Sequence, residues 1–185
     1  PLTNLKAQPG ENVEVLEEIS PIFAERTDVG DIVLDFGKCV AGKVRIRLRE
    51  RAGTVICMEH SEVKGVDGSF LKNIQTPFRD QQDIYVCAGK IGEVYEPMFT
   101  YHGFRYVKIS GITREINLQD YQAVVVGSRL EDGGFFRCSD GRMNQLQENI
   151  RRSQLSNMIS IPTDCPQREK AGWTGDVQIY AATAC

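Results

Sequence analysis

Short segments that alternate between apolar and polar residues fill the chain from about residue 11 to residue 127. The clearest is residues 43–49, in which Val44, Ile46 and Leu48 alternate with Lys or Arg. Because successive side chains of a strand point to opposite faces, a period of two predicts half-buried β-strands. Turn sequences such as Gly65-Val66-Asp67-Gly68 separate the segments. Many short strands at this spacing predict an antiparallel β-sandwich or barrel.

The predicted strands lie near residues 13–19, 32–36, 44–48, 54–60, 83–88, 94–100, 103–109 and 122–127. We expect the four cationic residues of the 43–49 segment (Lys43, Arg45, Arg47 and Arg49) to form the solvated face of a strand. No strand–helix–strand alternation occurs, which disfavours a doubly wound nucleotide-binding fold. Neither Gly-x-Gly-x-x-Gly nor a P-loop is present, so no cofactor is expected.

Composition excludes several classes of protein. With 185 residues, 41% apolar and 25% charged, the chain is typical of a soluble globular protein of one domain, or one domain plus part of another. A net charge of −3 gives no general attraction to nucleic acid or to an acidic membrane surface. No apolar stretch reaches the roughly 18 residues of a membrane helix. No signal peptide is recognisable, although the chain begins with Pro1 rather than Met.

Cysteine and histidine spacing gives no metal signature. The six cysteines are scattered (Cys39, Cys57, Cys87, Cys138, Cys165 and Cys185). There is no Cys-x-x-Cys pair and no histidine at ligand spacing, so we expect no metal site and mostly reduced thiols. His60 and His102 have no partner at a telling spacing, and His102 is expected to be a turn or packing residue.

The pattern becomes helical after residue 138. Ser139 is a suitable N-cap, and Met143, Leu146 and Ile150 recur at helical spacing. This helix should end near Asn157, because Ile161-Pro162 follows. A second helix is expected from about residue 176. Two helices joined by a loop resemble the beginning of a domain rather than a whole one.

The loop between these helices carries the residues best suited to chemistry: Asp164, Arg168, Glu169, Trp173 and Asp176. Glu and Asp are the usual proton carriers of sugar hydrolysis, and Trp offers an apolar face for a sugar ring. Structural roles are the alternatives. Asp176 would be a helix N-cap and Asp164 a turn residue. Glu169 would be a surface charge, Trp173 a core residue and Arg168 a structural ion-pair partner.

The segment from Ser160 to Asp176, SIPTDCPQREKAGWTGD, resembles the signature of the bacterial α-L-rhamnosidase family of glycoside hydrolases. Companion segments occur in the family's order. Residues 33–38 and 41–45 look like the opening of its β-sandwich domain, residues 99–107 like a late strand pair, and residues 136–146 like the first helix of its (α/α)6 barrel. The resemblance therefore spans nearly the whole chain.

The resemblance implies a mainly β fold, with an antiparallel β-sandwich at residues 1–128 and the first helices of an incomplete (α/α)6 barrel at residues 129–185. It implies an inverting hydrolase that removes terminal α-L-rhamnose from oligosaccharides or other glycosides. Glu169 would be the general acid, with its base outside this chain. Asp164, Asp176, Trp173 and Arg168 would contact the sugar. On this interpretation the chain is an internal fragment, inactive alone.

The chain departs from the family pattern at one point. Between the Gln-Arg and Gly-Trp pairs, many members carry two adjacent acids, and this segment is one residue longer than in this chain. Here Glu169 is the only acid between the two pairs. Two other functions stay open: a non-catalytic carbohydrate-binding β-sandwich module, and a barrel glycosidase of different sugar specificity. The natural glycoside, the oligomeric state and the compartment also stay open.

Overall fold

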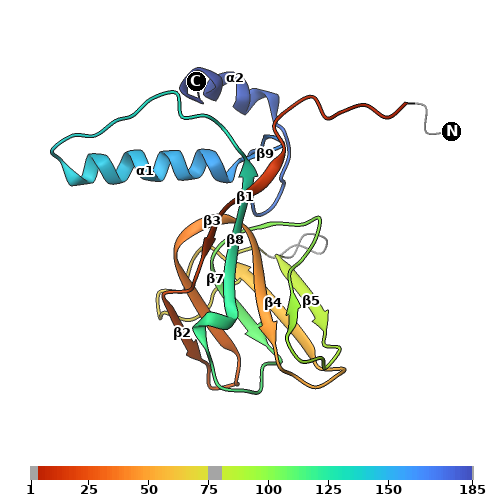
Figure 1. Cartoon of the computed structure of the whole chain (residues 1–185). Coiled ribbons are helices and arrows are strands. Elements are labelled where there is room, and N and C mark those ends of the chain that lie inside the picture. Colours follow the sequence, from red (N-terminus) through yellow and green to blue (C-terminus); the bar gives the residue numbers. More distant parts are fainter. Residues whose placement is uncertain (1–3, 75–80, 185) are drawn as a thin grey trace.

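A β domain and a small helical region make up the computed structural model, which describes residues 4–74 and 81–184. The elements in chain order are β1 (Val13–Ile19), β2 (Phe23–Arg26), β3 (Ile32–Leu48), β4 (Val55–Ser61), β5 (Gln82–Val86), β6 (Glu93–Tyr95), β7 (His102–Ser110), the 3₁₀ turn η1 (Leu118–Asp120), β8 (Tyr121–Ser128), α1 (Gly141–Ser156), β9 (Met158–Ile159), β10 (Ile161–Pro162) and α2 (Thr174–Ala184). The helices gather at one end of the β domain (Figure 1).

The β domain is one curled antiparallel sheet in the order β1-β8-β3-β7-β4-β5, with β2 and β6 also paired to β3. The 17-residue strand β3 pairs with β7 through its first part and with β8 through its second. Its register shifts between Asp35 and Val40, and Gly37 within this bulge has φ 78°. Because a bulge bends a strand, β3 contributes to both parts of the curled sheet. The predicted antiparallel β architecture is confirmed, as a single sheet curled on itself.

Alternation along the strands builds the core. Val44, Ile46 and Leu48 of β3 are at most 1% exposed, as the period of two predicts. Phe104 of the neighbouring strand β7 meets Phe36 of β3 edge to face, with ring centroids 5.7 Å apart. Burying an apolar side chain of this size stabilises a fold by about 1.5–3 kcal/mol, so these residues dominate the stability of the domain.

Two strand predictions need correction. Segments 32–36 and 44–48 belong to one strand, β3. The strand predicted at 94–100 ends at Tyr95 in β6. Pro97 has no N–H to donate to a sheet, and Phe99 has a φ of 60° and is fully exposed, so the backbone there leaves the sheet.

Three of the four cationic residues of the 43–49 segment pair with acids. Lys43 Nζ lies 2.8 Å from Glu96, and Arg45 lies 2.6 Å from the same carboxylate. Arg49, directly after β3, pairs with Asp120 at 2.6 Å. Arg47 and Arg49 are exposed, as expected for the solvated face of a strand.

The cysteines of the described residues are free thiols. Cys57 lies in β4, and Cys87 directly after β5 is 3% exposed. Burial raises the pKa of both thiols, so they pack as small neutral groups. Cys185 lies outside the described residues.

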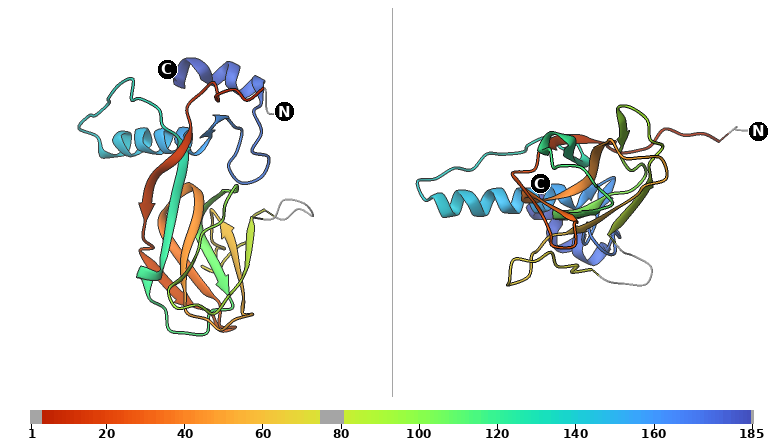
Figure 2. Two further views of the ribbon diagram at one scale, coloured as in Figure 1. Left: turned by 45° about the vertical axis from the view of Figure 1, so that its right-hand side comes forward. Right: turned by 90° about the horizontal axis from the view of Figure 1, so that it is seen from below.

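Helix α1 begins one residue later than its predicted cap implies. The carboxylate of Asp140, not the hydroxyl of Ser139, accepts the N–H of Arg142 at 2.8 Å. Within the described chain, neither α1 nor α2 contains a buried residue, and α1 projects beyond the sheet (Figure 2). No helix among the described residues combines the length and apolar character that crossing a membrane requires.

Candidate active site

The signature loop, residues 163–173, joins β10 to α2 and reaches back to the end of the β domain (Figure 1). Asp164 links the two ends of this loop by hydrogen bonds. The Asp164 N–H donates to the carbonyl of Ala171 at 3.1 Å, and the Ala171 N–H donates to Asp164 Oδ1 at 3.0 Å. Lys170, inside this turn, has a φ of 53°, a conformation that L residues rarely adopt. The loop is therefore held in one shape by an Asp side chain.

Asp164 is an ionised hydrogen-bond acceptor. Its second oxygen accepts the thiol of Cys165 at 3.2 Å. Burial alone would raise the pKa of Asp164, but the hydrogen bonds from Ala171 and Cys165 outweigh it and lower the pKa below its usual value. The Cys165 sulfur in turn accepts the N–H of Glu169 at 3.3 Å. Cys165 thus helps to hold the shape of the loop.

Glu169 is oriented by two donors of the same loop. The indole Nε1 of Trp173 donates to Glu169 Oε2 at 2.8 Å, and Arg168 Nη2 lies 3.3 Å from Oε1. The Glu169 side chain remains 34% exposed. A carboxyl group fixed by an indole yet open to solvent can exchange a proton with a bound molecule.

A cleft of about 520 Å³ lies between α1 and α2. Asp164, Trp173 and Asp176 line it, together with Asn149 of α1 and Asn157, which directly follows α1. This volume suits a small ligand, and the mixture of apolar and polar groups is usual for ligand sites. The structure therefore brings three of the five candidate residues together around one cleft. Arg168 and Glu169 join this group through the bond of Glu169 to Trp173.

Two of the structural alternatives fail. Helix α2 begins at Thr174, so Asp176 lies inside its first turn and is not its N-cap. Trp173 is 54% exposed, which excludes a core role within the described chain. Asp164 does hold a turn, but it also lines the cleft. A turn role and a ligand role are therefore compatible at Asp164.

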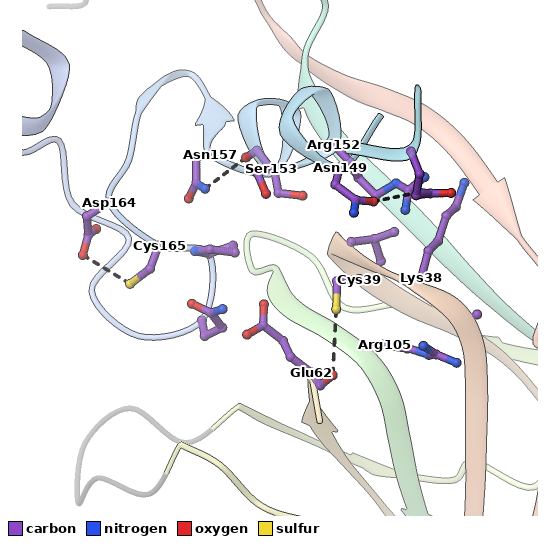
Figure 3. Close-up of a pocket in the computed structure, with 16 residues that line it drawn as sticks. Lys38, Cys39, Glu62, Arg105, Asn149, Arg152, Ser153, Asn157, Asp164 and Cys165 are labelled. Atoms are coloured by element: carbon purple, nitrogen blue, oxygen red, sulfur yellow. Dashed lines mark hydrogen bonds between the residues drawn. The ribbon is translucent and has the colours of Figure 1, made fainter. Parts of the chain in front are cut away.

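A second cleft of about 530 Å³ lies between α1, the signature loop and β3, where Asp164 and Cys165 also contribute (Figure 3). Its cations are paired with acids: Lys38 with Glu17 at 2.8 Å, Arg105 with Asp35 at 2.8 Å, and Arg152 with Glu148 at 3.0 Å. These pairs leave this cleft without a cationic group aimed at an anionic ligand.

The sequence did not show how the loop attaches to the β domain. The ammonium of Lys170 donates to the carbonyl of Tyr101 and lies 4.6 Å from the centre of its ring. A Cβ at Gly103 would come within 2.9 Å of Pro166 and 2.8 Å of Gln167. Close packing of the loop on β7 therefore requires glycine at this position. A glycine inside a strand pattern was the available signal.

A partly buried carboxyl group completes this attachment. Gln167 hydrogen-bonds to the side chain of Glu62, which directly follows β4. Burial raises the pKa of Glu62, although the bond from Gln167 acts against this shift. The loop that carries Glu169 thus takes its position from two strands of the β domain.

Comparison with known proteins identifies both regions. Residues 25–127 match the family model of the bacterial alpha-L-rhamnosidase concanavalin-like domain. Residues 131–185 match the model of the bacterial alpha-L-rhamnosidase 6 hairpin glycosidase domain. Both models describe domains of one class of protein, the glycoside hydrolases. The chain belongs to the bacterial α-L-rhamnosidase family, which confirms the resemblance of the signature loop and its companion segments.

The relatives are much longer proteins. The chain is 34% identical over 180 residues to an alpha-L-rhamnosidase of Streptomyces avermitilis, covering 96% of the chain and 17% of the relative. A Formosa agariphila alpha-L-rhamnosidase is 31% identical, with 99% and 20% covered. The chain thus spans about a fifth of the length of these relatives.

Solved structures show the same fold. The α-L-rhamnosidase of Dictyoglumus thermophilum superposes with a TM-score of 0.89 at 39% identity, covering 96% of this chain and 20% of its own. The Streptomyces avermitilis enzyme, solved in complex with L-rhamnose, gives a TM-score of 0.90 at 34% identity, with 96% and 17% covered.

Proposed function

We propose that the protein is an inverting α-L-rhamnosidase in which Glu169 is the general acid. The observation that carries the proposal is the fixed carboxyl group of Glu169, which Trp173 and Arg168 hold. Trp173 in turn lines a cleft of ligand size. A relative with the same fold has been solved with L-rhamnose bound, which supports rhamnose-containing glycosides as substrates.

The mechanism requires two carboxyl groups on opposite faces of the sugar. Glu169, protonated, gives its proton to the leaving oxygen, while a second carboxylate activates water from the other side. Such pairs lie roughly 6.5–9.5 Å apart, which leaves room for the water. In this proposal the general base is not a residue of the signature loop. Another part of the enzyme supplies this second carboxylate, since the relatives are about five times longer than the matched region.

The other candidate residues bind the sugar. Asp164 is ionised and lines the cleft, and Asp176 lines it from α2, so both can accept hydrogen bonds from rhamnose hydroxyls. The exposed indole face of Trp173 can stack on the apolar side of a deoxysugar. Arg168, which already touches Glu169, can orient that carboxyl group or donate to a sugar oxygen.

We also propose that residues 1–128 form the β domain and residues 129–185 the first helices of an (α/α)6 barrel. The ranges of the two matched family models support this division. The half-exposed apolar residues of α1 support it too, because barrel helices bury such a face against one another. The 185-residue chain by itself should therefore hydrolyse nothing.

The test uses the complete enzyme with an aryl α-L-rhamnoside. Glu169→Gln keeps the shape of the side chain but cannot donate the proton, so kcat should fall by about 10²–10⁴. Glu131→Gln, on an exposed residue outside the site, is the matched control and should retain activity. Thermal melting checks that both variants fold. Near-native turnover by Glu169→Gln would refute the assignment.

A second measurement tests inversion and separates hydrolysis from binding. Proton NMR of the first turnovers should show the anomer opposite to that of the substrate. Retained configuration would reject the inverting mechanism. L-Rhamnose binding detected by calorimetry, without turnover by the complete wild-type protein, would instead favour a carbohydrate-binding module.

A further inference from the structure

The two histidines of the chain meet in the interior of the β domain, and a buried aspartate lies beside them. His60 comes from β4, Asp83 from β5 and His102 from the start of β7. Their exposures are 2%, 8% and 4%. The two imidazole rings stack with centroids 4.2 Å apart. Of the two roles expected for His102, turn or packing, the structure therefore shows packing.

The hydrogen bonds of His60 fix its tautomer. Its Nδ1 lies 3.1 Å from the carbonyl oxygen of Gln81, which can only accept, so Nδ1 carries the proton. The other nitrogen, Nε2, then presents a lone pair. It lies 3.8 Å from Asp83 Oδ2 and has no hydrogen-bond partner among the described residues. Two acceptors thus face each other in a space closed to water, which is unfavourable unless a cation lies between them.

We propose that His60 Nε2, His102 Nε2 and the Asp83 carboxylate form a binding site for one divalent transition metal ion, with Zn²⁺ the best match. Imidazole and carboxylate together are a ligand set that suits zinc. The hydrogen bond from His60 Nδ1 to a carbonyl is the arrangement that usually orients a metal-binding histidine.

The distances between the ligand atoms agree with this proposal. His102 Nε2 lies 3.1 Å from both oxygens of Asp83, and His60 Nε2 lies 3.8 Å from Oδ2. All the ligand atoms lie within 4.8 Å of one another. Ligand atoms of a tetrahedral zinc site are about 3.3 Å apart, given bonds of about 2.0–2.1 Å. Movements of about 1 Å or less would complete such a site, with water or the second Asp83 oxygen in the fourth position.

The site would join β4, β5 and β7 directly beneath the signature loop. His102 follows Tyr101, whose carbonyl accepts the ammonium of Lys170. A metal at this place would stabilise the strands on which the loop packs. It would take no part in the acid chemistry of Glu169, so this inference stands or falls independently of the proposed function.

The first test measures metal directly. The purified protein is stripped by unfolding with a chelator, refolded, and offered Zn²⁺ or Co²⁺. We expect about one ion per chain, visible Co²⁺ bands of tetrahedral type without a thiolate charge-transfer band, and a Tm higher by about 5–10 °C with saturating Zn²⁺. Asp83→Asn should lose these effects. The control Cys39→Ser, which removes an exposed thiol, should keep them. Uptake that survives in Asp83→Asn would overturn the site.

The second test works even if Asp83→Asn does not fold. Because the 185-residue chain has 2 histidines, both in this cluster, every histidine ¹⁵N resonance of that chain, with no substitution made, belongs to the cluster. Adding Zn²⁺ to the metal-free protein should shift the Nε2 signals of both rings and leave the protonated Nδ1 of His60 in place. An unchanged spectrum would overturn the proposal and leave a metal-free histidine–aspartate pair.

Discussion

The β domain and the helical region differ in what holds them in place. Strands β3, β7 and β8 contain fully buried apolar side chains, whereas no residue of α1 or α2 in the described chain is buried. The β domain is thus stabilised by its own core. The helical region takes its position from contacts with the β domain, such as the bond from the Ser160 N–H to Ser128 Oγ at 3.0 Å. The β domain thus determines the fold, and the helical region carries the candidate catalytic and sugar-binding residues.

The largest effect should come from a core residue of the β domain. Phe104 is 0% exposed and packs against Phe36, so Phe104→Ala removes contacts and leaves a cavity. We expect a loss of about 3–5 kcal/mol in the free energy of unfolding. Phe135→Ala, on a ring that is 89% exposed before α1, is the control and should change little. Urea denaturation measures both. Equal losses of unfolding free energy in the two variants would contradict the difference in stabilisation between the β domain and the helical region.

A smaller effect within the β domain should depend on pH. Arg105 binds both oxygens of Asp35 across β3 and β7, at 2.8 and 2.9 Å. Burial would raise the pKa of Asp35, but the bonds from Arg105 and from the Gly37 N–H outweigh it and hold the pKa below 3.8. A lowered carboxyl pKa stabilises the fold above about pH 4, and this stabilisation disappears as the pH falls through the folded-state value.

Asp35→Asn tests this ion pair. At neutral pH it should lower the free energy of unfolding by about 1–2 kcal/mol, since the partly exposed guanidinium is screened by water. Below about pH 4 the variant and the wild type should converge. Denaturant melts across pH 2–7 provide the measurement. A difference that stays constant down to pH 2 would show that Asp35 contributes through packing and not through its charge.

A third effect should be confined to the junction of the two regions. In Gly103→Ala the new methyl group would displace Pro166 and Gln167 from β7. We expect the signature loop to loosen, with faster tryptic cleavage after Arg168 or Lys170, while the unfolding free energy changes by less than about 1 kcal/mol. Gly134→Ala, where a Cβ meets nothing within 4 Å, is the matched control. Unchanged cleavage would show that the loop does not depend on this contact.

The sequence could predict the features of the fold that depend on local patterns. Alternation is a local signal, so most strands, the antiparallel architecture and the core residues of β3 were found, and helical spacing gave α1 to within a few residues. Errors arose where backbone geometry overrides the pattern, as at Gly37, where β3 bends without ending. The candidate loop residues were identified by their chemistry, and a family resemblance supplied their roles, which stay predictions.

Residue spacing along the sequence could not predict the long-range contacts. His60, Asp83 and His102 lie on three strands that only the curled sheet brings together. The bond of Lys170 to Tyr101 likewise joins residues far apart in the chain. A local pattern predicts which side of a strand is buried, but not which buried polar groups will meet.

The smallest effect should be on the exposed side of α1, and it bears directly on the proposed barrel. Ile150 is 42% exposed, so Ile150→Ala in the 185-residue chain should lower the unfolding free energy by less than about 0.5 kcal/mol. In the complete enzyme the same change should cost about 2–4 kcal/mol, if further barrel helices bury this face as we propose. Gln145→Ala, an exposed residue on the side of α1 opposite to Ile150, should cost little in both. Thermal and denaturant melts of the two proteins provide the comparison. An equally small cost for Ile150→Ala in the complete enzyme would mean that α1 is not packed as a barrel helix, because a buried isoleucine cannot be truncated without leaving a cavity.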